Sequence, residues 1–589
     1  MQRAAFCIVL SLLAACAATP PATPTAPPVP PAPPAVAPPA KEADPYPDDA
    51  EITRAAAAYL DLYAEIHPES ATGLGLHEHD ADLDDRSTRG FDAATDREAA
   101  MLDALEKRFA AAKVSPAGQT DLALVVGALR CDVRKRRVER PLQRAPQIYS
   151  EPLDAIFQMT ARDYAPADER ARKVLARLDK IPGVVALAKQ NLLNPPKIWT
   201  ENAIDRAGSA KSFLDEQRTF LHDALPSESA RVDGSLKAAT AAYEDYRKFL
   251  RETVLPRSNG RFSAGRELFD YLLKNDYFLE EDSDALLAMG KKVFADTNAE
   301  MLTVAQRIDP KAKGWAEVTK TIKAKHPTAA ALLASYQKEV ARARAFLVEK
   351  DAVAFPSGDD LSVIDTPVFM RSTVTAAYDP PPAFGTAMTK GFFFVTPVEK
   401  TWSLAKQEEM LRENDWADIV DTSVHETYPG HHLQLSFARK HPSKIRRAID
   451  AAIFSEGWAL YSEELMSELG YYDDAQRLIQ LEWTLVRAAR IIIDVGLHVG
   501  SMTFDQAVKV LTDEVHLERA LALSEVKRYT ESATQPSAYI VGRQKILALR
   551  ERAKARDGAR FSLKAFHSDL LSHGSIAPSL VGREMFADR

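Results

Sequence analysis

Cysteine is scarce in this chain, which has three among its 589 residues. Cys7 and Cys16 fall in the N-terminal targeting segment, so the folded body contains Cys131 alone. A single thiol excludes an intramolecular disulfide, even in an oxidising compartment. Long apolar runs are also lacking, because no stretch after the N-terminal segment is apolar enough to span a bilayer. Packing of the body, and not covalent cross-linking, must therefore hold the fold.

A large excess of charge is missing too, since the formal net charge is −8. This mild acidity argues against nucleic acid as the main partner. The sequence has no fixed-period repeat, which argues against a solenoid. With 46% hydrophobic residues the chain can bury a large core. Two subdomains are expected because single cores stop growing near about 250–300 residues. Nothing in the sequence specifies an oligomeric state.

The N-terminus, MQRAAFCIVLSLLAAC, combines one arginine, a short apolar run and small residues, as a targeting segment does. Leu13-Ala14-Ala15-Cys16 resembles a bacterial lipobox, in which the cysteine is acylated and becomes the mature N-terminus. We predict a signal peptide at 1–15 and a lipid anchor on Cys16. Ala17 at the next position favours the outer membrane, with the protein facing the periplasm. An ordinary signal peptide with an incidental cysteine is the alternative.

Residues 20–39 contain eleven prolines, which favour polyproline II and cannot build a core. Residues 16–47 are therefore predicted to be a semi-rigid tether. Helical periodicity dominates 48–352, the predicted N-terminal subdomain, and returns after about 400 in the predicted catalytic subdomain, 353–589. DLSVIDTPVFMR and KGFFFVTPV read as strands with a loop, AAYDPPPAFG, between them. We expect a mainly α protein with one small antiparallel sheet beside the active-site helix.

Residues 425–432, HETYPGHH, resemble a zinc-peptidase helix with unusual spacing. The usual motif has histidines at i and i+4, but here Pro429 stands at i+4 and the histidines follow at i+6 and i+7. On a regular helix, i and i+6 differ by roughly 120° in azimuth and about 9 Å in rise, so they cannot share a metal. A break at Pro429-Gly430 would turn His431 or His432 back towards His425.

A catalytic zinc needs a third protein ligand and an open position for water. Glu456, in FSEGWALYSEEL, is the best candidate, because it lies off the apolar stripe of its predicted helix and beside Gly457. Glu463 is placed to orient a ligand histidine. Glu426 follows the first ligand directly and is predicted to be the general base that activates the zinc-bound water.

HETYPGHHLQ followed by EGWALYSEEL resembles the bacterial domain-of-unknown-function family 885, whose members are often lipoproteins. That family resembles the gluzincin metallopeptidases, such as the oligopeptidases related to thimet oligopeptidase. The resemblance covers almost the whole body and implies His425, His431 and Glu456 as the zinc ligands, with His432 in reserve. GFFFVTP is similar to the edge strand along which metallopeptidases lay out a peptide. A plain buried strand is the alternative.

The resemblance also extends to RYTESATQPSAYIVGRQ, where Gln535, Tyr539 and Gly542 match a family pattern, although Ala533-Thr534 replace its usual Pro-Gly. It implies that Tyr539 donates to the oxyanion, while a core aromatic is the alternative. In RIIIDVGLHVG, Asp494 and His498 lie at i and i+4, so the carboxylate is predicted to orient an imidazole towards the site. A satisfied core histidine is the alternative.

The function expected from these residues is zinc-promoted hydrolysis of short peptides at the cell envelope, with Glu426 as base and Tyr539 or His498 steadying the oxyanion. Two other functions remain open. One is a non-catalytic lipoprotein that binds peptides and keeps a metal for structure. The other is a zinc amidase of the cell wall.

Replacing Cys16 with serine tests the N-terminal prediction. Cys16→Ser removes the thiol to which the lipid is attached, so the protein should lose its acylation and be released or misprocessed. Membrane fractionation and mass spectrometry of the mature N-terminus measure this. An unmodified N-terminus elsewhere in the wild-type protein would contradict the anchor.

Overall fold

The computed structural model describes residues 45–367, 371, 375–385 and 389–587. The predicted signal peptide, Cys16 and nearly all of the predicted tether lie outside the described residues. Tyr46–Arg589 form one compact unit. Within the part that the structure describes, no helix is long and apolar enough to cross a membrane.

Helices make up most of the described chain, which confirms the predicted mainly α class. Those before the sheet are α1 (Asp49–Ile66), α2 (Pro68–Leu74), α3 (Thr88–Arg108), α4 (Pro116–Glu139), α5 (Pro141–Arg144), α6 (Pro152–Ala161), α7 (Ala167–Asn191), α8 (Lys197–Ala224), α9 (Ser229–Phe249), α10 (Arg266–Asn275), α11 (Ser283–Ile308), α12 (Ala316–Lys323) and α13 (Leu332–Lys350). Those after it are α14 (Leu404–Arg412), α15 (Trp416–Glu426), α16 (His431–Ala438), α17 (Lys444–Ala448), α18 (Ala452–Glu468), α19 (Asp474–Val499), α20 (Phe504–Lys509), α21 (Arg519–Tyr529), α22 (Ala538–Asp557), α23 (Leu563–Ser572) and α24 (Pro578–Met585).

Three strands, β1 (Asp360–Asp365), β2 (Ala376–Asp379) and β3 (Lys390–Val395), form a sheet in the order β1-β3-β2. The prediction of an antiparallel sheet is wrong in one respect, because β1 runs parallel to β3 while β2 runs antiparallel to it. The predicted loop contains β2, which forms a hairpin with β3 and places β3 in the centre. GFFFVTP is therefore not an edge strand.

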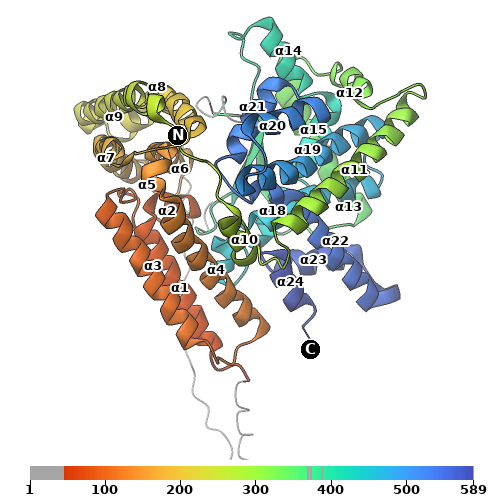
Figure 1. The fold of residues 1–589 in the computed structure, drawn as a ribbon, viewed down its shortest axis with the longest axis horizontal. Coiled ribbons are helices and arrows are strands. Elements are labelled where there is room, and N and C mark those ends of the chain that lie inside the picture. Colours follow the sequence, from red (N-terminus) through yellow and green to blue (C-terminus); the bar gives the residue numbers. More distant parts are fainter. Residues whose placement is uncertain (1–44, 368–370, 372–374, 386–388, 588–589) are drawn as a thin grey trace, which may run out of the picture. The chain divides into compact units, whose positions relative to one another are not determined.

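The longest buried element is α19, which packs along α11 and also contacts α15 (Figure 1). A capping box fixes its start, where Asp473 accepts the backbone N–H of Gln476 and the Gln476 side chain accepts that of Asp473. Most of its residues from Leu478 to His498 are buried on every side of the helix. A helix buried all round serves as the central support for the elements packed on it.

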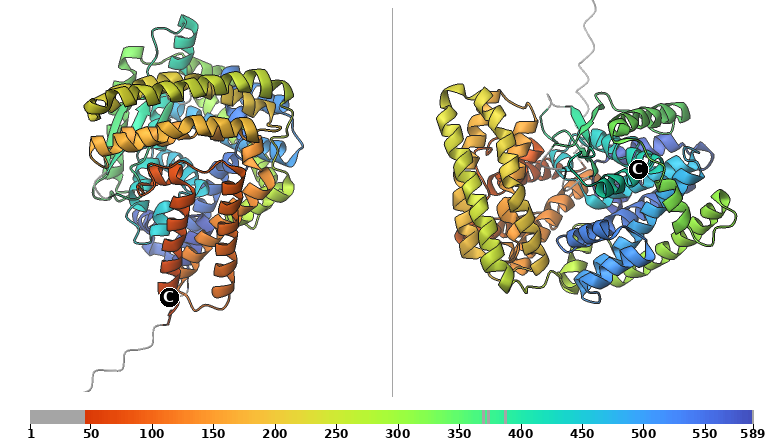
Figure 2. Two further views of the ribbon diagram at one scale, coloured as in Figure 1. Left: turned by 90° about the vertical axis from the view of Figure 1, so that its left-hand side faces the viewer. Right: turned by 90° about the horizontal axis from the view of Figure 1, so that it is seen from above.

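The main hydrophobic core joins helices that are far apart in sequence. It includes Leu129 of α4, Phe454 of α18, Ile491 of α19 and Ile540 of α22, all of them nearly or fully buried. Elsewhere in the unit, α7, α8 and α9 pack side by side as long helices around a second core (Figure 2). The predicted subdomain boundary after residue 352 stays a prediction.

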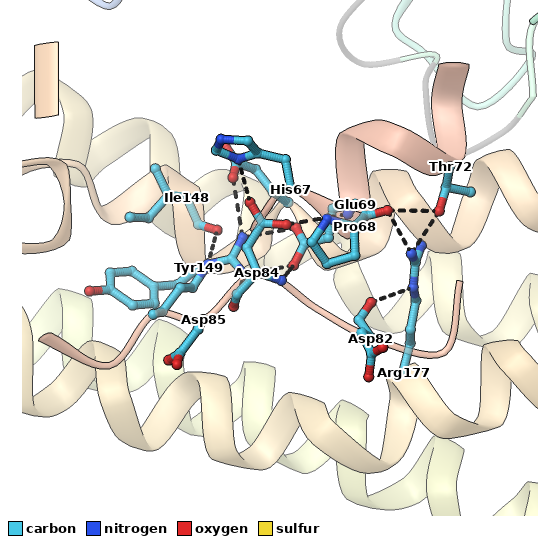
Figure 3. A network of polar contacts seen from close by, with 12 residues as sticks. His67, Pro68, Glu69, Thr72, Asp82, Asp84, Asp85, Ile148, Tyr149 and Arg177 are labelled. Atoms are coloured by element: carbon cyan, nitrogen blue, oxygen red, sulfur yellow. Dashed lines mark hydrogen bonds and ion pairs between the residues drawn. The ribbon is translucent and has the colours of Figure 1, made fainter. Parts of the chain in front are cut away.

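Buried polar groups tie the segment after α2 to α7 (Figure 3). Arg177 of α7 is fully buried and donates to the Thr72 hydroxyl at 2.7 Å and to the Asp82 carbonyl at 2.9 Å. Arg86, also buried, makes a two-pronged bond to Glu69, at 2.6 and 2.9 Å. Charges that leave water need such partners, so this network fixes the path of the chain between α2 and α3.

Candidate metal centre

His425 lies in the last turn of α15, on the helix that the apolar pattern predicts. The side chain of Asp415 caps the start of α15 by accepting two backbone N–H groups of the first turn. Ile419, Val420 and Val424 pack in the core that α15 shares with the sheet. With its start capped and one face buried, α15 presents His425 in a fixed direction, 6% exposed.

The helix ends after Glu426, and α16 begins at His431. Gly430 lies directly against the end of α15, where its N–H donates to the Val424 carbonyl at 3.0 Å. A Cβ on Gly430 would lie 1.8 Å from the His425 carbonyl oxygen, so only glycine fits. The chain therefore turns back at once, and the His425 and His431 rings stand 4.8 Å apart with their planes at 88°.

The neighbouring helix α18 holds this turn and adds an acidic side chain. Its Trp458 donates an indole N–H to the Pro429 carbonyl at 2.8 Å. Two residues earlier, Glu456 Oε2 lies 3.7 Å from His425 Nε2 and 3.4 Å from His431 Nε2. One carboxylate oxygen thus meets both imidazoles.

These distances suit a tetrahedral zinc. Ligand atoms about 2.0–2.1 Å from the metal are separated from each other by about 3.4 Å along the edges of the tetrahedron. Two imidazoles and a carboxylate, with the fourth position open, form a donor set that catalytic zinc uses. His425, His431 and Glu456 therefore fit Zn²⁺.

Glu463, two helical turns further along α18 on nearly the same face as Glu456, lies behind His425. The His425 Nδ1–H donates to Glu463 Oε1 at 2.7 Å, which leaves Nε2 for a metal. Burial lowers the pKa of His425, but the carboxylates of Glu456 and Glu463 outweigh burial and raise it to about 9. Burial acts to raise the pKa of Glu456, yet the two histidines hold that pKa well below its usual value. A metal ion binding here would displace a proton.

Glu426 borders the same point from the other side. Ligand atoms of His425, Glu426 and His431 all lie within 4.8 Å of one another. Glu426 Oε2 accepts the backbone N–H of Tyr378 in β2 at 2.9 Å. Because one oxygen is held by the sheet, the carboxylate has a fixed position beside the three ligands. Both Glu426 and Glu456 thus border the two histidines, and the assignment of Glu456 as the third ligand stays a prediction.

Tyr539 lies in the first turn of α22, which crosses α18 at very close range. A Cβ on Gly457 would lie 2.5 Å from the Gly542 backbone, so both glycines are needed at the crossing. The Tyr539 ring stacks beside that of His425, with centroids 6.5 Å apart and planes at 19°. Burial raises the pKa of Tyr539, so its hydroxyl is protonated at neutral pH. That hydroxyl has no hydrogen-bond partner among the described residues.

His432 points away from this group. It is fully buried, and its Nδ1 lies 3.0 Å from the Tyr378 hydroxyl. The Tyr428 ring packs edge-on against it, with centroids 5.1 Å apart. Burial lowers the pKa of His432 to about 4. The structure thus brings His431 to His425 and Glu456, and leaves His432 to support β2.

Asp494 and His498 lie near the C-terminal end of α19, next to the turn that precedes α22. Asp494 accepts the Ser537 hydroxyl at 2.5 Å and the Thr534 backbone N–H at 3.2 Å. His498 Nδ1 accepts the Ala264 N–H at 3.3 Å, and its Nε2–H donates to the Tyr529 carbonyl. With both ring nitrogens used by the backbone, His498 supports the fold and lies outside the metal group. Asp494 positions the start of α22, and through it Tyr539.

Sequence reasoning missed three residues near the centre, namely Tyr378, Arg487 and Arg490. Tyr378 lies in the segment predicted as a loop, so nothing in the sequence indicated the hydrogen bond from its backbone N–H to Glu426. The two arginines could have been identified from the sequence, because they interrupt the apolar run LVRAARIIIDVGL. Charged residues inside a helix that is apolar all round must be buried, and buried charges need partners or a function.

The fold and the site define a mainly helical protein in which two histidines and a glutamate converge at a point fit for a metal. This chain belongs to the DUF885 family, described as "Bacterial protein of unknown function", whose model matches residues 68–585. No curated protein matches it.

Several solved structures share the fold, among them two proposed lipoproteins. One is a proposed lipoprotein of unknown function from Shewanella oneidensis, 24% identical with a TM-score of 0.76, covering 91% of this chain and 99% of its own. The other is a proposed lipoprotein from Colwellia psychrerythraea, 19% identical with a TM-score of 0.79, covering 91% of this chain and 98% of its own.

Substitution of the two neighbouring histidines separates their roles. His431→Ala removes a nitrogen that faces Glu456, so the purified protein should lose bound zinc. His432→Ala is the matched control, since loss of a supporting residue typically costs only about 10–100-fold in metal affinity. Metal analysis after dialysis against a defined zinc buffer measures both. Retention of zinc by His431→Ala and its loss from His432→Ala would reverse the assignment.

The buried Asp494 predicts a pH dependence of stability. Burial raises its pKa to about 7, against the hydrogen bonds from Ser537 and Thr534. A carboxyl whose folded-state pKa is raised stabilises the fold fully below its unfolded pKa. It loses that contribution as the pH rises from about 4 to 7, at up to about 1.4 kcal/mol per pH unit.

Asp494→Asn mimics the protonated carboxyl and should remove this loss. Its melting temperature relative to wild type should be higher at about pH 8 than at about pH 5. Asp245→Asn, at an exposed carboxylate paired with Lys189, is the control. An Asp494→Asn difference that stays constant with pH would show that the carboxyl is ionised in the folded protein.

Proposed function

We propose that this protein is a zinc-dependent peptidase that cleaves short peptides at the bacterial cell envelope. The observation that supports this most is the approach of His425 and His431 to one oxygen of Glu456, at 3.7 and 3.4 Å, with Glu426 held beside them. A structural zinc site needs no base. The position of Glu426 therefore favours an enzyme over a non-catalytic peptide-binding protein.

A cavity of about 790 Å³ adjoins the centre and has the size of a site for a short peptide. Its wall includes His425, Glu426 and Tyr539, so the three residues line the same cavity. The free edge of β2 at Ala376 also lines it, next to the N–H that binds Glu426. Substrate, base and hydroxyl donor would thus meet in one place.

Different residues of this chain would perform different steps of the hydrolysis. A bound Zn²⁺ would polarise the scissile carbonyl and lower the pKa of a water molecule. Glu426, fixed through Oε2 by the Tyr378 N–H, takes the proton of the attacking water and delivers it to the leaving amine. The Tyr539 hydroxyl donates a hydrogen bond to the carbonyl oxygen as that oxygen becomes negatively charged. Glu463 keeps His425 oriented throughout.

The anchor is part of the same proposal. The lipobox-like Leu13-Ala14-Ala15-Cys16 supports lipidation at Cys16, and Ala17 supports placement in the outer membrane. The two solved structures of similar fold from Shewanella oneidensis and Colwellia psychrerythraea are both described as proposed lipoproteins. The proline-rich segment would let the body reach roughly 90 Å from the membrane.

Glu426→Gln decides between an enzyme and a metal-binding relic. The amide oxygen can still accept the Tyr378 N–H, so folding and zinc content should stay near normal. Removal of the base should lower turnover at least about 10²-fold. Cleavage of a peptide library, with zinc analysis of the same samples, measures both.

Glu456→Gln is the matched comparison, because it replaces an anionic ligand with a neutral amide and should lose zinc itself. Full activity of Glu426→Gln on a peptide that the wild type cleaves would refute the mechanism. A zinc-loaded wild type that cleaves no peptide would favour the peptide-binding function.

A further inference from the structure

Two arginines from α19 line the cavity beside the candidate metal centre. Arg487 and Arg490 are one helical turn apart, and both share the cavity wall with Tyr539. Neither is needed as a metal ligand or a base. Cations buried at a catalytic cavity cost free energy unless they are paired, so their partners decide what they do there.

Arg487 is incompletely paired. Its side chain is 9% exposed, and its Nη2 lies 3.3 Å from Glu463 Oε1, which also accepts the His425 N–H. Its Nε and Nη1 are buried without a hydrogen-bond partner among the described residues. The rings of Trp483 and Tyr539 lie 5.4 and 5.7 Å from its Cζ and hold the guanidinium in place. Two donors of a fixed group remain unused.

Arg490 has a spare donor as well. Its Nε donates to the Tyr529 hydroxyl and its Nη2 to Glu525 Oε2, both at 2.9 Å. Arg528 donates to the same Glu525 oxygen at 3.1 Å. Two guanidinium groups thus share one carboxylate, and the Nη1 of Arg490 has no partner in the described part of the chain. The excess positive charge lies against Tyr539, whose ring centroid is 4.6 Å from the Arg490 Cζ.

Asp421 also interacts electrostatically with Arg487. Its Oδ1 accepts the Tyr472 hydroxyl at 3.1 Å. Burial and the charge of Glu463 raise the pKa of Asp421 well above its usual value. This shift favours the neutral form of the carboxyl, which weakens its pairing with Arg487.

We propose that Arg487 and Arg490 bind a carboxylate of the substrate, so that the cavity selects peptides with a carboxylate close to the scissile bond. This inference rests on the proposed function, because it names the substrate class of the same site. Charge-assisted bonds from two guanidinium groups suit a carboxylate, which accepts them through both oxygens.

The geometry sets how far that carboxylate lies from the reaction. The Tyr539 ring lies near both groups, with its centroid 4.6 Å from the Arg490 Cζ and 6.5 Å from the His425 ring. The Arg487 Nη2 lies 3.4 Å from the His425 Nδ1. An extended residue spans about 3.3–3.6 Å, so no more than about three residues separate the carboxylate from the ligands. A C-terminal carboxylate held here leads to release of a short C-terminal fragment. Water gives its hydroxyl to the new carboxyl group and its proton to the released amine.

Binding measured without metal tests the inference separately from catalysis. The probes are trialanine as the free acid and as its C-terminal amide, titrated calorimetrically into full-length protein stripped of metal with EDTA. Stripping excludes a direct carboxylate–zinc contact. The free acid should bind at least about tenfold more tightly, as expected for one or two charge-assisted hydrogen bonds.

A second pair of probes distinguishes the two sources of a carboxylate. Ala-Glu-Ala amide and Ala-Gln-Ala amide differ only in a side-chain charge. Preference for the free acid of trialanine assigns the arginines to the C-terminus, whereas preference for the glutamate peptide assigns them to an acidic side chain. Equal binding within each pair, or no binding by any probe at millimolar concentration, would overturn the proposal.

Arg487→Gln should bring the acid and the amide to within about threefold of each other, since it removes one of the two cations. Arg412→Gln is the matched control, because Arg412 lines the same cavity but pairs with Glu408, away from Tyr539. Circular dichroism checks the folding of both variants. The wild-type comparison needs no variant and stands even if Arg487→Gln does not fold.

Assays of peptide hydrolysis distinguish a failure of the proposed peptidase function from a failure of the proposed carboxylate site. If the protein binds the free acid more tightly but cleaves no peptide in the presence of zinc, the carboxylate site is supported and the peptidase function is refuted. If the protein cleaves acid and amide substrates with equal kcat/KM, the peptidase function is supported and the carboxylate site is refuted.

Discussion

Contact between the Gly430 backbone and the last turn of α15 is the constraint on which the candidate metal centre depends. With a Cβ position 1.8 Å from the His425 carbonyl oxygen, position 430 accepts no side chain. The chain can therefore reverse within four residues and start α16 at His431. A continuous helix would send the second histidine to another face, since i and i+6 are not neighbours on a helix. The broken helix replaces the regular spacing of two ligands on one face.

A second close approach brings the remaining groups together. α18 carries Glu456 and Glu463, and its Trp458 is bonded to the Pro429 carbonyl inside the break. α22 crosses α18 where Gly457 meets Gly542, which places Tyr539 beside His425. Small residues at a crossing let two backbones approach closely, so side chains from both helices reach one point. The positions of His431, Glu456 and Tyr539 beside His425 all depend on these two glycine contacts.

The helix α19 packs against these elements and contributes buried, charged side chains to the wall of the cavity. Asp494 fixes the turn before α22, while Arg487 and Arg490 face the cavity. Placing such groups in a low-dielectric interior costs stability, and proteins keep them mainly where function uses their charge or specificity. The sheet adds a backbone donor to the same cavity, because the N–H of Tyr378 holds Glu426.

Much of the local structure follows from the sequence alone. Apolar periodicity placed His425 on a helix, and the Pro429-Gly430 pair predicted the break, because these residues restrict or free the backbone wherever they occur. Glu456 and Glu463 were identifiable from their position on a helix with a separate apolar stripe. The mainly α class followed from periodicity over most of the chain.

Relations between distant segments came only from the tertiary structure. β1 pairs parallel with β3, and β2 arises in a predicted loop, because strand order depends on which neighbours cover each edge. His498 and Asp494 share a helix turn, yet the backbone of other segments uses their side chains before they can reach the metal group. Neighbouring His431 and His432 have nearly the same local signal. Glu456 on one side and Tyr378 on the other decide which of them faces the candidate metal position. Local pattern is set by the backbone chemistry of each residue, whereas partner choice is set by packing across the whole fold.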